Sequence, residues 1–215
     1  MEKIFEALGQ IGLVPVIRID QPQDAVPLAR ALLEGGLGCA EITFRTAAAE
    51  EAIRRVAAEL PDMLVGAGTV LTLQQAEQAV KAGAQYIVAP GFDPAIVSWC
   101  QERRVPVLPG VATPTEINMA LTRGVTLLKF FPAEELGGIR MLKALYGPYQ
   151  EVKFIPTGGI NAQSLPGYLA LPNVVACGGS WMATGKLISA GQFDQIAHMA
   201  RDARTIVRRA RGEEE

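Results

Sequence analysis

Eight short apolar runs recur along the chain, and each is followed by a stretch with helical periodicity. The runs are VPVI, CAEITF, LVGAG, YIVAP, VPVLPG, LLKFF, FIPTGG and VVACGG. The stretches between them place apolar residues at i, i+3, i+4 and i+7, and several end in glycine. The repeating unit is therefore a strand and then a helix, about 20 to 26 residues long. Near-continuous apolar strands are typical of a parallel sheet whose outer face is covered by helices.

Eight such units in 215 residues predict one domain, a (β/α)8 TIM barrel over residues 1–215. A doubly wound sheet of this size would usually carry a nucleotide loop, but neither GxGxxG nor GxxxxGK[ST] occurs in the sequence. We expect EKIFEALGQIG to form an N-terminal helix before the first strand, at the bottom of the barrel. Residues 212–215, GEEE, are expected to be a frayed tail.

Charge and cysteine content exclude several classes of protein. The formal net charge is −2, which gives no basic surface for nucleic acid or for an anionic membrane. The first residues include acidic side chains and no long apolar run, so neither a signal peptide nor a spanning helix is expected. Cys39, Cys100 and Cys177 are widely spaced, and we expect buried, reduced thiols in a cytoplasmic protein. With one histidine, His198, expected to be structural or solvated, a metal site is not predicted.

Polar residues near the carboxyl ends of the predicted strands indicate a reactive site, because this fold builds its sites there. In CAEITFRT, Glu41, Thr43 and Arg45 alternate along the strand and so face the same side. In LLKFF, Lys129 faces the barrel interior if its two neighbours pack against the helices. A lysine in apolar surroundings beside another cation can attack a ketone as the free amine. The pattern favours Schiff-base chemistry with Glu41 as the proton carrier.

Each of these residues also has a structural interpretation. Glu41 and Lys129 could form a buried ion pair that does no chemistry. Arg45, and Arg18 just after the first strand, could be ordinary surface arginines. These alternatives stay open on the residues alone.

Two glycine pairs follow the seventh and eighth predicted strands, in PTGGI at 156–160 and CGGSW at 177–181. Barrels often bind phosphate at this position through the N–H groups of loops and a helix N-terminus, and glycine lets the backbone approach an anion closely. Glycine pairs also form plain turns. The two pairs together predict a phosphate site, to which Arg18 could lend a positive charge.

The motifs VPVI, EITFRT, VGAGTVL, APG, PGVATPTE, KFFPAE, PTGGI and GGSW occur in this order over about residues 10–200. In combination they resemble the 2-keto-3-deoxy-6-phosphogluconate (KDPG) aldolase family, whose members also act as 4-hydroxy-2-oxoglutarate (KHG) aldolases. The resemblance implies a metal-independent class I aldolase on a (β/α)8 barrel, without a cofactor and typically homotrimeric. Relatives acting on the galactonate-derived phosphate ester read VGG and GSDLY at the barrel end, whereas TGG and GSW here favour the gluconate-type branch.

Carried onto this sequence, the resemblance implies that Lys129 forms the iminium with the substrate ketone and that Glu41 is the general acid and base. Arg45 and Thr69 correspond to the groups that hold the carboxylate of pyruvate. The implied pocket walls and phosphate-binding residues are Pro90, Phe131, Thr157, Gly158, Gly159, Gly179 and Ser180.

The implied reaction cleaves KDPG to pyruvate and glyceraldehyde 3-phosphate, and KHG to pyruvate and glyoxylate. Three alternatives remain open from the sequence. The same lysine and glutamate could serve only the unphosphorylated KHG. Glu41 could instead be the base of a sugar-phosphate isomerase or epimerase, which would form no covalent adduct. The chain could also be a non-catalytic barrel that binds a phosphate and is stabilised by it.

Overall fold

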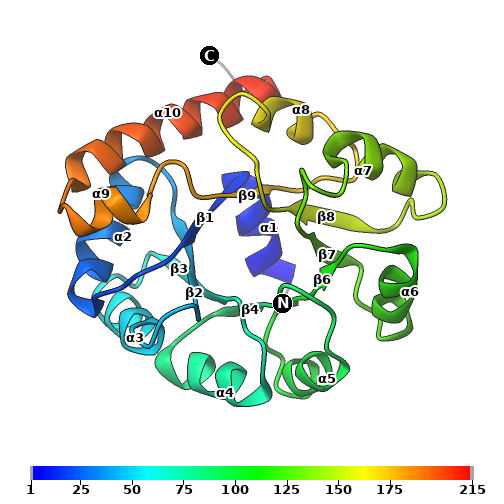
Figure 1. Cartoon of the computed structure of the whole chain (residues 1–215), viewed down its shortest axis with the longest axis horizontal. Coiled ribbons are helices and arrows are strands. Elements are labelled where there is room, and N and C mark those ends of the chain that lie inside the picture. Colours follow the sequence, from blue (N-terminus) through cyan, green and yellow to red (C-terminus); the bar gives the residue numbers. More distant parts are fainter. Residues whose placement is uncertain (1, 214–215) are drawn as a thin grey trace.

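The computed structural model describes residues 2–213 and has an α/β fold in which parallel strands surround the centre and helices form an outer ring (Figure 1). The strands are β1 (Leu13–Ile17), β2 (Cys39–Thr43), β3 (Leu64–Gly68), β4 (Tyr86–Val88), β5 (Val107–Leu108), β6 (Gly110–Val111), β7 (Leu127–Phe130), β8 (Lys153–Pro156) and β9 (Cys177–Gly179). The helices are α1 (Glu2–Ile11), the 3-10 helix η1 (Pro22–Asp24), α2 (Ala25–Glu34), α3 (Ala49–Glu59), α4 (Leu73–Ala82), α5 (Pro94–Glu102), α6 (Pro114–Thr122), α7 (Gly138–Tyr146), α8 (Leu165–Leu169), α9 (Gly185–Ser189) and α10 (Phe193–Arg211).

The strands form two parallel sheets rather than one continuous sheet. The larger has the order β5-β4-β3-β2-β1-β9, and the smaller has the order β6-β7-β8. The predicted fifth strand, VPVLPG, is divided into β5 and β6 by Pro109, which has no N–H to continue a ladder. The N–H of Lys129 still donates to the carbonyl of Pro109 at 2.9 Å, and isolated bridges join Thr157 to Gly178 and Phe154 to Val174. These contacts connect the two sheets at both junctions, and together the sheets form one strongly curled parallel array, called the curled sheet below.

Two apolar layers separate the inside of the curled sheet from its outside. Outward side chains such as Ile42, Leu128 and Phe130 are buried against the helices. The inward layer includes Tyr86, Val14 and Ile155, and it also receives Leu8 of α1. The predicted N-terminal helix therefore exists, and it packs its apolar side against interior side chains of the strands, near the centre of the ring in Figure 1. This inner cluster leaves the opposite ends of the strands for polar groups.

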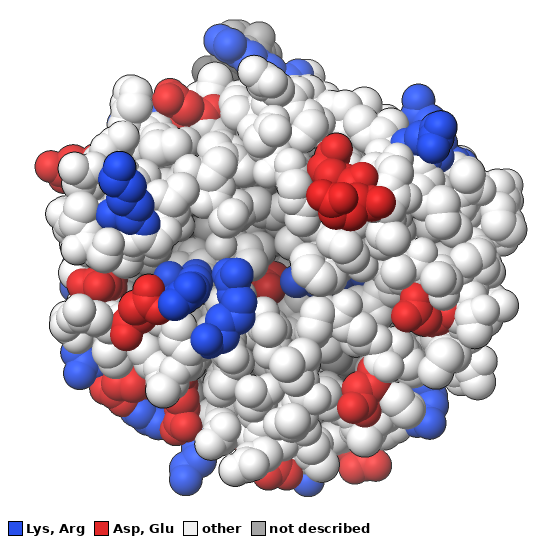
Figure 2. Space-filling view, viewed as in Figure 1, with Lys and Arg blue, Asp and Glu red and all other residues white. Residues whose placement is uncertain are grey.

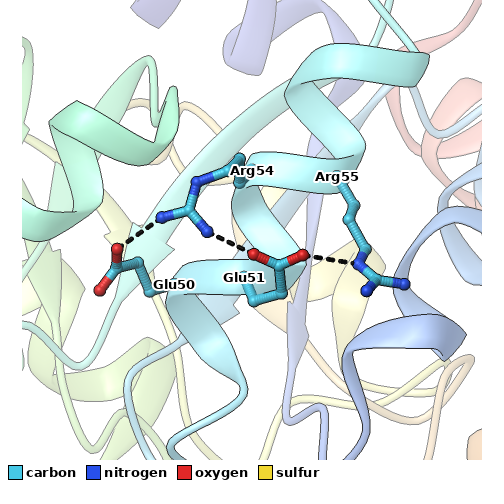
Figure 3. A network of polar contacts seen from close by, with 4 residues as sticks. All are labelled: Glu50, Glu51, Arg54 and Arg55. Carbon is cyan, nitrogen blue, oxygen red and sulfur yellow. Dashed lines mark hydrogen bonds and ion pairs between the residues drawn. The ribbon is translucent and has the colours of Figure 1, made fainter.

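Ion pairs between side chains one turn apart lie on the exposed surface of α3 (Figure 3). Arg54 hydrogen-bonds both Glu50 and Glu51, and Arg55 donates to Glu51 at 2.9 Å. Hydrogen bonds from Arg55 and Arg54 lower the pKa of the Glu51 carboxyl, and the bonds to Glu51 and Glu50 raise the pKa of Arg54. Pairs at i+3 and i+4 spacing add modest helical stability, and exposed pairs contribute little else.

The last helix, α10, ends in a left-handed glycine cap. Gly212 takes a left-handed φ of 68°, and the N–H of Glu213 donates to the carbonyl of Arg208 at 3.0 Å. A glycine in this conformation ends a helix with its last carbonyls satisfied. The frayed tail expected for residues 212–215 stays a prediction, and residues 214–215 lie outside the described part of the chain. His198 is exposed on α10, 3.4 Å from Asp202, as expected for a solvated histidine.

No helix among residues 2–213 combines the length and apolar character that crossing a membrane requires.

The three cysteines, Cys39, Cys100 and Cys177, are free and buried. Burial raises the pKa of the Cys39 and Cys177 thiols far above its ordinary value and that of Cys100 to about 12.

Because the thiolate is the reactive form of cysteine, we expect the three thiols not to react with Ellman's reagent in the native protein at mildly alkaline pH. The same titration after unfolding in guanidinium should release all the thiols. If one equivalent of thiol in the folded protein reacted rapidly with the reagent, that result would contradict the burial described above.

Candidate active site

A cavity of about 440 Å³ opens at the carboxyl ends of the strands. Figure 2 shows this face hollowed near its middle, with Lys and Arg side chains gathered at one edge of the hollow. The lining is mostly apolar with a few polar groups, as in typical small-molecule sites. The cavity is lined by Val16, Arg45, Thr69, Leu71, Pro90, Lys129, Phe131, Thr157, Gly158, Gly159, Ile160, Gly178, Gly179 and Ser180.

Most of the residues predicted from the sequence meet in this one cavity. Val16, Leu71, Ile160 and Gly178 also line it and were not predicted. The alternation that identified Lys129 also applies to β1, where it could have indicated Val16. Leu71 and Ile160 lie in loops, where strand alternation gives no signal. Gly178 lies on β9, and as a glycine it has no side chain whose direction alternation could indicate.

Lys129 lies on β7 and points inward, as predicted. Its neighbours Leu128 and Phe130 are fully buried in the outer apolar layer, and Lys129 itself is only 4 % exposed. The Lys129 Nζ atom lies 3.2 Å from Oε1 of Glu41, and 5.3 Å from the centre of the Phe131 ring. An ammonium at that distance from an aromatic ring is within range of a cation–π interaction.

Glu41 is buried on β2 beside the cavity, in contact with the Lys129 side chain that lines it. Two glycines on β3 leave space for neighbouring side chains, Gly68 for Glu41 and Gly66 for Tyr86. A Cβ atom on Gly68 would lie 2.2 Å from Oε1 of Glu41, and one on Gly66 would lie 2.2 Å from the ring of Tyr86. Burial raises the pKa of Tyr86 well above its ordinary value, with further contributions from Cys39 and Glu41, so its hydroxyl stays neutral.

Arg45 stands at the cavity edge, four residues after Glu41. Its Nε donates to Oγ1 of Thr43 at 3.0 Å, and the Thr43 hydroxyl donates to the carbonyl of Ile17 on β1 at 2.7 Å. Thr43 was recognised as an inward residue from the alternation of β2, but the hydrogen bonds that connect it to Arg45 were not foreseen.

Thr69 follows β3 with a φ of 54°, in the left-handed region. A β-branched residue rarely adopts this conformation, which costs free energy and persists only where surrounding contacts enforce it. The backbone is held on both sides, because the carbonyl of Gly68 accepts from Phe44 at 2.8 Å and the N–H of Val70 donates to Val88 at 3.1 Å. Thr69 lines the cavity. Backbone strain of this kind is often found at functional sites.

The glycine loop after β8 adopts a conformation that only glycine takes easily. Gly158 and Gly159 have φ values of 107° and 78°. The loop is tied to the segment after β7, since Ala133 donates to Thr157 at 2.8 Å and Glu134 donates to Gly158 at 3.1 Å. Candidate anion donors here are loop N–H groups, because the following helices α8 and α9 have only 5 residues each.

Arg18 is the one predicted site residue that the structure does not bring to the cavity or to its residues. It forms an exposed ion pair with Asp20, with 2.9 Å between Nη2 and Oδ1. Within residues 2–213, no cluster of three or more His, Cys, Asp or Glu side chains is arranged to hold a metal ion.

The buried pair yields a testable prediction about stability. Replacing Lys129 by methionine leaves the Glu41 carboxylate buried without its partner, which should lower the free energy of unfolding by about 3 to 5 kcal/mol. The double variant Lys129→Met/Glu41→Gln should recover most of that loss, because it buries no charge. Urea unfolding of the single and double variants measures the coupling.

The control is the exposed pair Arg55 and Glu51, where the substitutions Arg55→Met and Glu51→Gln should have nearly additive effects. Additive effects at Lys129 and Glu41 would contradict an interacting buried pair.

Comparison with known proteins identifies the family. Residues 4–199 match the family model described as KDPG and KHG aldolase. A 2-dehydro-3-deoxy-phosphogluconate aldolase of Treponema pallidum is 51 % identical over 207 residues, covering 96 % of this chain and 99 % of the relative. The crystal structure of KDPG aldolase from Legionella pneumophila, with pyruvate captured as a covalent carbinolamine, is 40 % identical with a TM-score of 0.88, covering 92 % and 95 % of the two chains. A Zymomonas mobilis KDPG aldolase structure with 3-phosphoglycerate is 36 % identical with a TM-score of 0.85, covering 93 % and 94 %. The chain belongs to the KDPG and KHG aldolase family.

Proposed function

We propose that this protein is a class I aldolase that cleaves KDPG to pyruvate and glyceraldehyde 3-phosphate through a Schiff base on Lys129. The observation that carries the proposal is the buried amine of Lys129, which lines the cavity and lies 3.2 Å from Glu41. The Legionella relative with pyruvate held as a carbinolamine supports a covalent route over isomerase or epimerase chemistry.

In the proposed reaction Lys129 passes its proton to Glu41 and attacks C2 of the 2-keto acid as the neutral amine. Glu41 returns the proton to the hydroxyl of the carbinolamine, which leaves as water and gives an iminium. This cation accepts the electron pair of the C3–C4 bond, so the bond breaks as Glu41 takes the C4 hydroxyl proton, directly or through a water. Glyceraldehyde 3-phosphate leaves, and the enamine is protonated at C3, for which the Glu41 that has just gained a proton is the nearest acid. Water then hydrolyses the iminium, which frees pyruvate and the amine.

We assign the carboxylate of the keto acid to Arg45 and Thr69, because a guanidinium fork matches a carboxylate and both residues line the cavity with Lys129. The other end of the substrate is assigned to the loops after β8 and β9, with Thr157, Gly158, Gly159, Gly179 and Ser180 around the phosphate and Pro90 and Phe131 as walls. The relative crystallised with 3-phosphoglycerate supports a phosphorylated ligand. Arg18 is not assigned to the substrate, because it forms the exposed ion pair with Asp20.

KHG is the second proposed substrate. Its cleavage to pyruvate and glyoxylate needs the same lysine, glutamate and carboxylate site but no phosphate. The family name favours activity on the two substrates.

For the architecture, we propose that residues 1–215 form a single domain, a closed (β/α)8 barrel, and that it assembles as a homotrimer. The ladder of this barrel is interrupted at Pro109 and is reduced to isolated bridges between the segments of β8 and β9. Leu71, Leu73 and Met119 are exposed large apolar side chains that could take part in such an assembly. The free, buried cysteines support a cytoplasmic location.

Reduction with borohydride in the presence of pyruvate tests the chemistry. We expect a reduced pyruvyl adduct on Lys129 by peptide mapping, absent without pyruvate and absent in Lys129→Met. Glu41→Gln should lower the turnover of KDPG cleavage by about a hundredfold or more, because it removes the proton carrier. No adduct in folded protein would favour the isomerase or binding-protein alternatives, and an adduct on another lysine would contradict the assignment to Lys129.

The phosphate assignment predicts a split between the two substrates. Gly159→Ala puts a Cβ atom 2.6 Å from Cγ of Glu134 at a left-handed φ, so the loop must shift. We expect KM for KDPG to rise about tenfold while the kinetics of KHG cleavage stay nearly unchanged. Gly185→Ala is the matched control, because nothing lies within 4 Å of the added Cβ. Equal losses for both substrates would show that the loop does not bind phosphate.

A further inference from the structure

Thr43 has a hydrogen-bonding arrangement that cannot be reversed. Its side chain is buried at the end of β2, donates to the carbonyl of Ile17 at 2.7 Å and receives the Nε–H of Arg45 at 3.0 Å. A carbonyl can only accept and a guanidinium can only donate. The single hydroxyl proton must therefore point to Ile17, and the oxygen lone pairs must face Arg45.

This arrangement determines which edge of the Arg45 guanidinium is free. Nε is used by Thr43, whereas the two terminal nitrogens make no hydrogen bond or ion pair with other residues in the range 2–213. Arg45 also lines the cavity that contains Lys129. A carboxylate can bind a guanidinium through two parallel N–H donors, and here the edge formed by the terminal nitrogens remains available for it.

We propose that Thr43 is a positioning residue for the carboxylate of the 2-keto acid, acting through Arg45. This inference rests on the proposed function. Thr43 ties the guanidinium to backbone of both β1 and β2, and β2 also carries Glu41 two residues earlier. An exposed arginine samples many rotamers, so holding one edge of it in advance reduces what the substrate must order on binding.

A second threonine in the same segment separates the two ways in which Thr43 could act. The hydroxyl of Thr46 donates to the carbonyl of Ile19 at 2.5 Å, so it anchors the loop after Arg45 to the same neighbouring segment but does not contact the guanidinium. If Thr43 merely anchored backbone, removing either hydroxyl would have the same effect. If Thr43 aligns Arg45, only its own removal weakens carboxylate binding.

The experiment compares Thr43→Val with Thr43→Ser, Thr46→Val and Arg45→Lys. The readouts are KM and kcat for KDPG cleavage and the pyruvate concentration that gives half-maximal borohydride trapping on Lys129. We expect Thr43→Val to raise KM and the half-trapping concentration about tenfold while kcat changes less than about threefold. Thr43→Ser keeps both hydrogen bonds and should behave as wild type, and Thr46→Val should leave both quantities nearly unchanged.

A double-mutant cycle shows whether Thr43 acts through Arg45. In the Arg45→Lys background there is no Nε to hold, so Thr43→Val should add little further effect. Thr43→Ala serves if the valine variant does not fold, because it also removes the hydroxyl without adding volume. The inference is overturned if the hydroxyl-free variants lose only melting temperature, or if their effect persists with Arg45→Lys. Failure of wild-type protein to trap pyruvate would instead overturn the proposed function, and the inference with it.

Discussion

The buried pair of Lys129 and Glu41 is the interaction on which the rest of the structure depends. Two charged groups inside a protein are tolerated only when each compensates the other, because their desolvation is costly. The partners come from strands β2 and β7, 88 positions apart in sequence, so the pair requires the sheet to curl until these strands face each other. It also requires Gly68, since any side chain there would occupy the space of the Glu41 carboxylate.

The buried pair also divides the interior of the curled sheet into two ends with different side chains. Near their amino ends, Leu8 of α1 joins Val14, Cys39 and Tyr86 in an apolar cluster that supplies packing and neutral groups. Near their carboxyl ends, the interior changes to the charged pair and then to an open cavity. The pair thus lies between a dry layer, which limits access of water, and a space large enough for a small molecule. A reactive amine needs both conditions.

Strand periodicity indicated Glu41, Arg45 and Lys129, because the alternation of a strand fixes which side chains face inward. The pocket walls and the partner of Arg45 at the carboxylate came from the family resemblance. Strand periodicity identified Lys129 and Glu41 without any knowledge of distance. Features that depend on contacts between distant segments were beyond it. The division of a strand at Pro109 depends on how this segment pairs with the strands on both sides of it. The exposed ion pair of Arg18 with Asp20 is likewise not indicated by strand alternation. The frayed tail was predicted from composition, whereas the helix cap depends on the conformation of Gly212.

The cavity combines two kinds of binding surface, and their difference bears on substrate range. Arg45 is anchored through Thr43, and Thr69 is held in a strained conformation, so the end that would bind a carboxylate is preorganised. Another part of the lining is glycine backbone after β8 and on β9, which offers N–H groups but no charged side chain. Under the proposed assignment, such a site would hold the keto acid beside Lys129 and would gain affinity from a phosphate. Such a division would let one lysine and one glutamate serve both phosphorylated and unphosphorylated substrates, since the chemistry depends only on the rigid end.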